Sequence, residues 1–146
     1  MEKEKPDNLR IATVNDFPMI EQCLLDEGFD VDRHSFKNDI SFVSDVGFFS
    51  WAFLGAVPRL RHFYLYPDKR AKGFRNAIGL LRIFEKMLSG LGYTRYVAES
   101  PREKPEMERF IKYIGNYEEY HEHDGDKFFI VTIGARRHEN LHAHSN

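Results

Sequence analysis

The spacing of apolar residues changes from strand-like to helical in the middle of the chain. Residues 40–46, 48–54 and 60–66 are apolar segments of strand length, and glycine- or proline-containing breaks separate them as in hairpins. The following segment, residues 74–88, has apolar residues at helical spacing, namely Ala77, Leu81, Phe84 and Leu88. Hairpin-linked strands followed by an amphipathic helix predict a sheet covered by helices.

The rest of the chain continues this alternation. One further helix is expected between an N-cap at Asn15 or Asp16 and a stop at Gly28, and another over residues 103–114, ending at Gly115. The polar residues 31–39 are either helical or irregular. Further strands are predicted at residues 9–14, 93–99, 117–121 and 127–133. This order predicts an α/β (α+β) fold with a mixed, mostly antiparallel central sheet of about six to seven strands and helices on both faces.

The chain of 146 residues has the length of one domain. We expect this domain to span residues 1–133, and residues 134–146, which lack periodicity, to form a loose tail. A net charge of −2 argues against nucleic acid and membrane surfaces as partners. The charged N-terminus lacks the apolar region of a secretory signal, and no apolar run reaches the roughly 20 residues of a membrane span, so we expect a soluble, cytoplasmic protein.

Residues 67–75 have the charge of an anion site. Four cations, Lys69, Arg70, Lys72 and Arg75, surround Gly73 where the predicted strand passes into the helix. A helix N-terminus presents unpaired N–H groups and a partial positive charge, and glycine permits close approach of a ligand. A pyrophosphate would fit this arrangement. The alternative is a solvated basic loop.

The segment Pro67-Asp-Lys-Arg-Ala-Lys-Gly-Phe-Arg75, together with Arg109-Phe-Ile-Lys-Tyr-Ile-Gly115 and the order of elements, resembles the GNAT (Gcn5-related N-acetyltransferase) superfamily. The resemblance covers residues 9–133. Residues 109–133 also resemble short GNAT-like proteins of tailed phages, which would place the protein in a host cytoplasm or a virion. The resemblance implies acetyl-CoA (coenzyme A) as cofactor, bound by Leu65, Tyr66, Arg70, Ala71, Lys72, Gly73, Phe74 and Arg75.

The resemblance also implies where the chemistry takes place. The fourth strand, near residues 63–66, and the fifth, residues 93–99, would splay apart and offer backbone N–H groups to the thioester carbonyl. Candidate general bases are Glu99 and His62, although a carboxylate at a strand end is often only solvated and a histidine beside tyrosines is often only packed. The family's acidic tyrosine corresponds to Ile111, which has no proton to give, so Tyr117 is the candidate substitute.

Two functions are consistent with these residues. The first is an N-acyltransferase that moves an acetyl group from acetyl-CoA to an amine of a small molecule or a protein. The second is a non-catalytic GNAT-like binding or structural module, because Ile111 and Arg75 depart from the family's pattern. The resemblance to phage proteins implies that such a module would be phage-encoded. Arg75 stands where the family has a small residue, so it either strains a left-handed backbone or bonds a phosphate directly. We expect no metal site, and leave a homodimer open.

Overall fold

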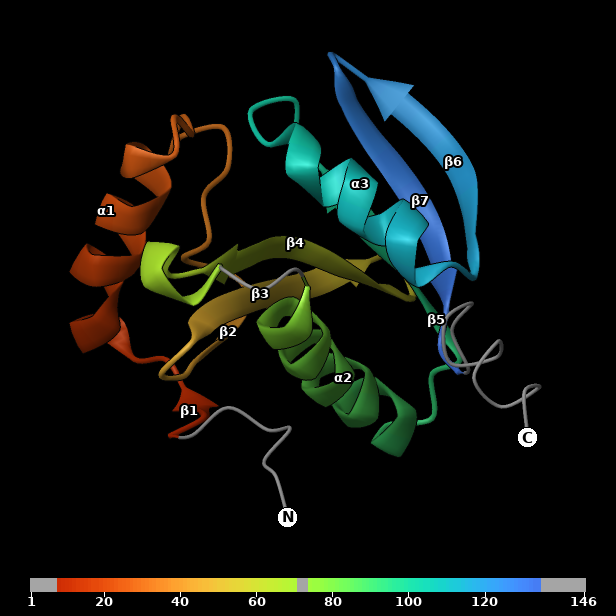
Figure 1. Cartoon of the computed structure of the whole chain (residues 1–146), viewed down its shortest axis with the longest axis horizontal. Helices are drawn as coiled ribbons and strands as arrows, with labels where there is room; N and C mark the ends of the chain where they lie inside the picture. Colours follow the sequence, from red (N-terminus) through yellow and green to blue (C-terminus); the bar gives the residue numbers. More distant parts are fainter. Residues whose placement is uncertain (1–7, 71–73, 135–146) are drawn as a thin grey trace.

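The computed structural model describes residues 8–70 and 74–134. Seven strands form one open sheet in the order β1-β2-β3-β4-β5-β7-β6 (Figure 1). The strands are β1 (Arg10–Ile11), β2 (Ile40–Val43), β3 (Gly47–Leu54), β4 (Val57–Leu65), β5 (Arg95–Ser100), β6 (Tyr117–His123) and β7 (Asp126–Thr132). The helices are α1 (Phe17–Asp26), α2 (Arg75–Gly90), α3 (Pro105–Ile114) and the short 3-10 helices η1 (Val14–Asp16) and η2 (Pro67–Lys69).

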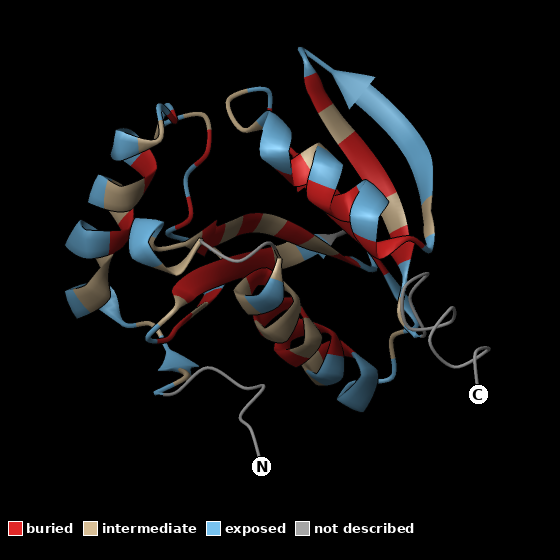
Figure 2. Cartoon of the chain, in the orientation of Figure 1, coloured by how far each residue is buried: buried red, intermediate tan, exposed pale blue. Residues whose placement is uncertain are grey.

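The sheet is mixed and mostly antiparallel, which confirms the predicted architecture. Strands β4 and β5 are parallel, and every other neighbouring pair of strands is antiparallel. Helix α2 connects β4 to β5, as a parallel pair requires a crossover. Strand β6 lies at one edge and is exposed along nearly its whole length (Figure 2).

Each face of the sheet carries its own apolar core. On one face, Ile20 and Leu24 of α1 pack against Phe48 and Tyr64. On the other, α2 and α3 pack on a larger cluster that includes Phe49, Leu60, Phe84, Phe110 and Phe129. Figure 2 shows the buried residues of the helices turned towards the sheet. The helices therefore cover both faces, as the order of elements predicted.

The N-terminal predictions need correction. Strand β1 has only two residues, and Val14 belongs to η1 instead of a strand over residues 9–14. Thr13 caps η1 by accepting from the Asn15 N–H, while Asp16 accepts from the Thr13 N–H. Asp16 occupies the N-cap position of α1, but its side chain makes no capping hydrogen bond to that helix. Residues 31–39 form turns, not a helix.

Two glycines are required by geometry. Gly115 has φ of +77° and ends α3, as predicted from the sequence. At Gly47 the backbones of β3 and β4 approach so closely that a Cβ would lie 1.9 Å from the Tyr64 carbonyl oxygen. This contact fixes the start of β3 beside the end of β4.

An irregularity in β4 determines the geometry of the site. Ser50 pairs with His62, but the next residue of β3 pairs with Leu60, so Arg61 is one extra residue on β4. Such a bulge bends a strand and changes which face its side chains meet. Accordingly Leu60 lies in the core under α2 and α3, whereas Tyr64 lies in the core under α1.

Candidate active site where β4 and β5 diverge

Strands β4 and β5 are paired over a very short stretch. The paired residues are Arg59 with Val97 and Leu60 with Ala98, and the bulge at Arg61 follows at once. Strand β4 then continues to Leu65 with no paired partner on β5 among the described residues. The divergence predicted for this pair is therefore present. It opens a narrow pocket lined by Leu24, Phe29, Leu60, Arg61, His62, Phe63, Tyr64, Glu99, Pro101, Lys104 and Met107.

A larger groove of about 220 Å³ adjoins this pocket on the side of α2 and α3. The groove shares three lining residues with the pocket, Phe63, Lys104 and Met107. Its other lining residues are Leu65, Arg70, Phe74, Ala77, Glu106 and Phe110. The groove thus combines apolar walls with a few charged groups, which is the usual composition of a small-molecule site.

The structure gathers part of the predicted cofactor set around the groove. Leu65, Arg70 and Phe74 line it, whereas Tyr66 packs against the α1 core. Arg75 is the exposed first residue of α2 and does not have a left-handed backbone, so the strain considered for it is absent. No described side chain caps the N-terminus of α2. The predicted ligands Ala71, Lys72 and Gly73 lie outside the described residues.

Arg70 is already engaged within the chain. Its Nε donates to the Leu65 carbonyl oxygen at 2.7 Å, and its Nη2 lies 3.0 Å from a carboxylate oxygen of Glu27. The guanidinium also lies 5.0 Å from the centre of the Tyr64 ring. A ligand phosphate would therefore have to compete with these contacts or add to them.

Glu99 is buried at the end of β5 and has cationic neighbours. Its side chain is 4% exposed, and its Oε1 accepts from Nε and Nη2 of Arg59 at 3.2 and 2.8 Å. The Nε of Arg61 lies 3.9 Å from the same oxygen and has no hydrogen-bond partner. The Oε2 lies 3.9 Å from Nδ1 of His34. The carboxylate that faces the pocket is thus held in place by its surroundings and is not simply solvated.

His62 is buried and lines the same pocket as this carboxylate. Its Nε2 lies 2.8 Å from the carbonyl oxygen of His34, so Nε2 donates and Nδ1 carries the lone pair. Burial lowers the pKa of His62 to about 3, against the partly opposing effect of this hydrogen bond. The imidazole is therefore neutral at pH 7, and it connects β4 to the turn that carries His34.

Acidification is expected to destabilise the chain through His62. In the unfolded chain this imidazole takes up a proton near pH 6.5, but in the folded chain only near pH 3. The free energy of unfolding is therefore not reduced by this group above pH 6.5, and it falls as the pH drops from 6.5 towards 3. Between pH 7 and pH 5 the loss should be about 2 kcal/mol. His62→Gln keeps an N–H for the His34 carbonyl but does not titrate, so urea denaturation should show a smaller pH dependence. Equal pH dependence in both chains would contradict this assignment.

The structure does not bring Tyr117 together with the other two candidates. Tyr117 pairs in register with Val131, and Val131 pairs with Tyr96 of β5. Glu99 is three residues further along β5, a distance of about 10 Å. Tyr117 packs against Phe129, with ring centres 5.9 Å apart. Ile111 is 1% exposed, within the core under α2 and α3.

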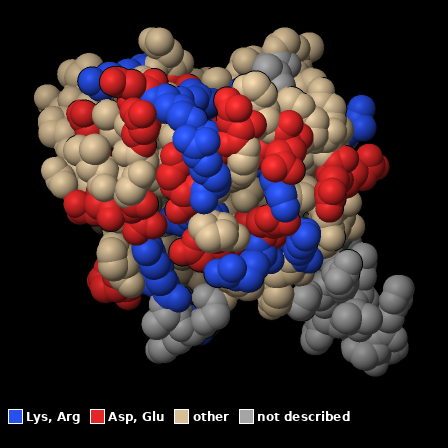
Figure 3. Space-filling model, turned by 90° about the horizontal axis from the view of Figure 1, so that it is seen from above, with Lys and Arg blue, Asp and Glu red and all other residues tan. Residues whose placement is uncertain are grey.

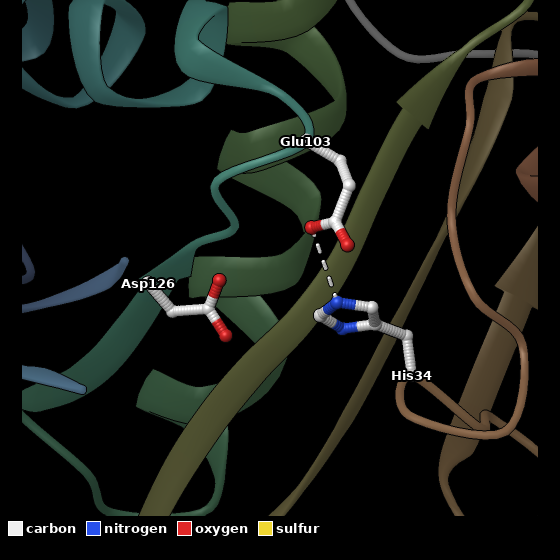
Figure 4. Close-up of side chains that lie close together, drawn as sticks. All are labelled: His34, Glu103 and Asp126. Atoms are coloured by element: carbon white, nitrogen blue, oxygen red, sulfur yellow. Dashed lines mark ion pairs between the residues drawn. The ribbon is translucent and has the colours of Figure 1, made fainter. Parts of the chain in front are cut away.

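A cluster around His34 was not predicted from the sequence. Nε2 of His34 lies 3.3 Å from Oε1 of Glu103, and ligand atoms of His34, Glu103 and Asp126 all lie within 4.8 Å of one another (Figure 4). Figure 4 shows these side chains converging from the turn after α1, the segment before α3 and the start of β7. Such a set could hold a metal ion.

In this structure a guanidinium bridges the acids of that cluster. Arg33 donates to Glu103 at 2.8 Å and also bonds Asp126 and Nε2 of His34. Burial alone would raise the pKa of Asp126, but the hydrogen bonds from Arg33 and from the Arg102 N–H outweigh it, so that pKa lies below its usual value. The cluster is thus an internal ion network that ties the turn after α1 to the segment before α3 and to the start of β7.

Acidic and basic side chains are interspersed over the face of the molecule seen from above in Figure 3. Asp39 accepts from Arg61, a residue that lines the pocket, at 2.9 Å, and its side chain is 3% exposed. Glu99 and Asp126 have their own arginines, as described above. These three acids are therefore compensated by arginines inside the chain.

Solved structures share this fold at low sequence identity. A proposed acyl-CoA N-acyltransferase from Klebsiella pneumoniae superposes with a TM-score of 0.63 at 13% identity, over 87% of this chain and 97% of that chain. A chimera built on the Vibrio cholerae spermidine N-acetyltransferase gives a TM-score of 0.59 at 13% identity, over 94% of this chain and 99% of that chain. A GCN5-related N-acetyltransferase from Rhodopseudomonas palustris gives a TM-score of 0.54 at 16% identity, over 91% of this chain and 99% of that chain.

The chain therefore has the GNAT fold, as the resemblance predicted. No protein-family profile and no curated protein sequence matches it. None of the described helices has the length and apolar character needed to cross a bilayer.

Proposed function

We propose that the protein is an acyl-CoA-dependent N-acyltransferase that moves an acetyl group from acetyl-CoA to an amine. The observation that carries this proposal is the apolar groove that leads to the divergence of β4 and β5. A pantetheine arm is long and narrow and carries methyl and methylene groups between two amides, so its apolar parts fit a groove walled by Phe63, Phe74 and Phe110. The uncapped N-terminus of α2 lies beside Phe74, where the diphosphate would bind.

The residues at the divergence fit the needs of acyl transfer. A thioester placed there would meet backbone groups of β4 that are not paired with β5. Glu99, held by Arg59, is the proposed general base for the acceptor amine. His62, neutral and with a pKa near 3, is a weak base, so we assign it the positioning of the turn at His34. The acceptor classes to test are a polyamine, another small amine and a protein lysine.

The non-catalytic alternative also has an observation in its favour. Each acid–base group of the pocket is engaged inside the chain, Glu99 with Arg59 and His62 with the His34 carbonyl. The position of the family's acidic tyrosine is the buried Ile111. A chain that binds CoA but transfers nothing would be such a module.

Glu99→Gln is expected to slow acyl transfer about 10²- to 10⁴-fold, because an amide cannot take the amine's proton. The assay follows release of the CoA thiol from acetyl-CoA in the presence of a panel of amines, including spermidine and a lysine peptide. Glu122→Gln on the exposed strand β6 is the control and should keep the wild-type rate. A Glu99→Gln chain as fast as wild type would place the base elsewhere. CoA binding without thiol release for any amine would favour the non-catalytic module.

A further inference from the structure

Lys104 lies at the junction of the pocket and the groove, and its side chain has no role in the acyl transfer proposed so far. It is the N-cap residue of α3, and of the described lysines it is the one that lines both the pocket and the groove. Its side chain is 15% exposed, whereas Lys69, Lys112 and Lys127 are 39%, 44% and 44% exposed. Lys104 is thus an amine built into the candidate site.

The side chain of Lys104 crosses the opening between β4 and β5. Its helix packs on one face of the sheet, with Met107 one turn further on in the core under α2 and α3. Its Nζ, however, lies 5.0 Å from the centre of the Tyr64 ring and 3.3 Å from Oε1 of Glu27. Tyr64 belongs to the α1 core, on the other face. The amine therefore passes through the gap at which the thioester of a bound acyl-CoA is expected.

We propose that Lys104 is an internal acyl acceptor, so that the chain transfers an acyl group from acyl-CoA to its own Lys104 Nζ. This inference rests on the proposed function, because it requires the groove to bind acyl-CoA. The geometry that carries it is that Lys104 lines both the groove and the pocket, with its Nζ 5.0 Å from the centre of the Tyr64 ring. An amine fixed beside a thioester reacts at a high effective concentration.

The step balances with acyl-CoA as the single co-reactant. The lone pair of the deprotonated Nζ attacks the carbonyl carbon, a C–N bond forms, and the C–S bond breaks with its electron pair going to sulfur. The nitrogen gives up a proton, for which the carboxylate of Glu27 at 3.3 Å is the nearest acceptor. CoA leaves as the thiolate, which takes a proton from solvent. The products are an amide on Lys104 and free CoA.

The surroundings of Lys104 favour loss of the proton that blocks this attack. Burial lowers the pKa of Lys104, and the cationic Arg70 acts in the same direction, while Glu27 partly opposes both. Glu27 keeps a second partner in Arg70, 3.0 Å away. Acylation of Lys104 therefore leaves Glu27 paired and creates no unpaired buried carboxylate.

The test is a time course with acetyl-CoA on the full chain, followed by peptide mass mapping of each lysine. Lys112, exposed and 3.0 Å from Glu108, is the internal control because it also has a carboxylate partner. We expect Lys104 to be acetylated at least about tenfold faster than Lys112. Excess free CoA should suppress acetylation at Lys104 and leave it unchanged at Lys112. Lys104→Arg keeps the positive charge and should carry no acetyl group on that peptide.

A parallel thermal melt with CoA separates the two proposals. If CoA stabilises the wild-type and Lys104→Arg chains, but Lys104 reacts no faster than Lys112 or is not protected by CoA, the inference about Lys104 is overturned and the proposed function stands. If CoA stabilises neither chain, both are overturned. Rapid acetylation of Lys104 that CoA suppresses supports both.

Discussion

Leu65→Trp is expected to lower the affinity for CoA at least about a hundredfold, which corresponds to about 2.7 kcal/mol. Leu65 lies at the end of β4, is partly buried and lines the groove of about 220 Å³. An indole in its place would occupy the volume that the pantetheine arm needs, while the groove gives it room without overpacking the core. Calorimetric titration of CoA into the variant measures the effect.

The matched control for this variant lies on the same strand. Val57→Trp makes the same kind of enlargement at the other end of β4, where the side chain is 41% exposed and lines neither cavity. It should bind CoA as the wild-type chain does. Wild-type affinity in Leu65→Trp, with the fold intact by circular dichroism, would show that the groove is not the cofactor site.

Arg33→Ala is expected to destabilise the fold by about 2 kcal/mol. The substitution leaves Glu103 and Asp126 close together without their shared guanidinium, and uncompensated buried charge is costly. The figure is below the 3–5 kcal/mol typical of a fully buried pair because Arg33 is 25% exposed. Urea denaturation at pH 7 measures it. The deficit should shrink as the pH falls through the lowered pKa of Asp126, because the protonated carboxyl no longer needs the guanidinium.

An exposed pair of the same type is the control. Arg10 bonds Asp16 at 2.7 Å but is 56% exposed, so Arg10→Ala should cost much less than Arg33→Ala. Equal losses in the two variants would mean that the network around Arg33 is no more than a surface ion pair. Added Zn²⁺ should stabilise Arg33→Ala more than wild type, because His34, Glu103 and Asp126 could then approach a metal.

The fold was largely predictable because its signals are local. The change of apolar period marked the strands and helices, and glycines such as Gly115 marked where helices end. The N-terminal strand was wrong because Thr13 and Asp16 cap a 3-10 turn there, a side-chain preference that outweighs the apolar alternation of residues 9–14.

The site was less predictable because its geometry depends on pairing between distant segments. The bulge at Arg61 follows from the register of β3 against β4, and no residue of β4 signals it alone. The pairing of Arg33 with Glu103 and Asp126 joins residues 70 and 93 positions apart. Glu99 and His62 were found from their places in strands, and the structure places both at one pocket, whereas Tyr117 was inferred only by elimination and lies elsewhere.

The most direct test of the central claim is a crystal structure of the chain with CoA bound. In the proposed complex the groove between β4, α2 and α3 receives the pantetheine arm. The predicted result is an arm that runs between Phe63 and Phe110, with its sulfur where β4 leaves β5 and its diphosphate at the N-terminus of α2. A groove that stays empty at saturating CoA, or CoA bound on another face, would contradict the account.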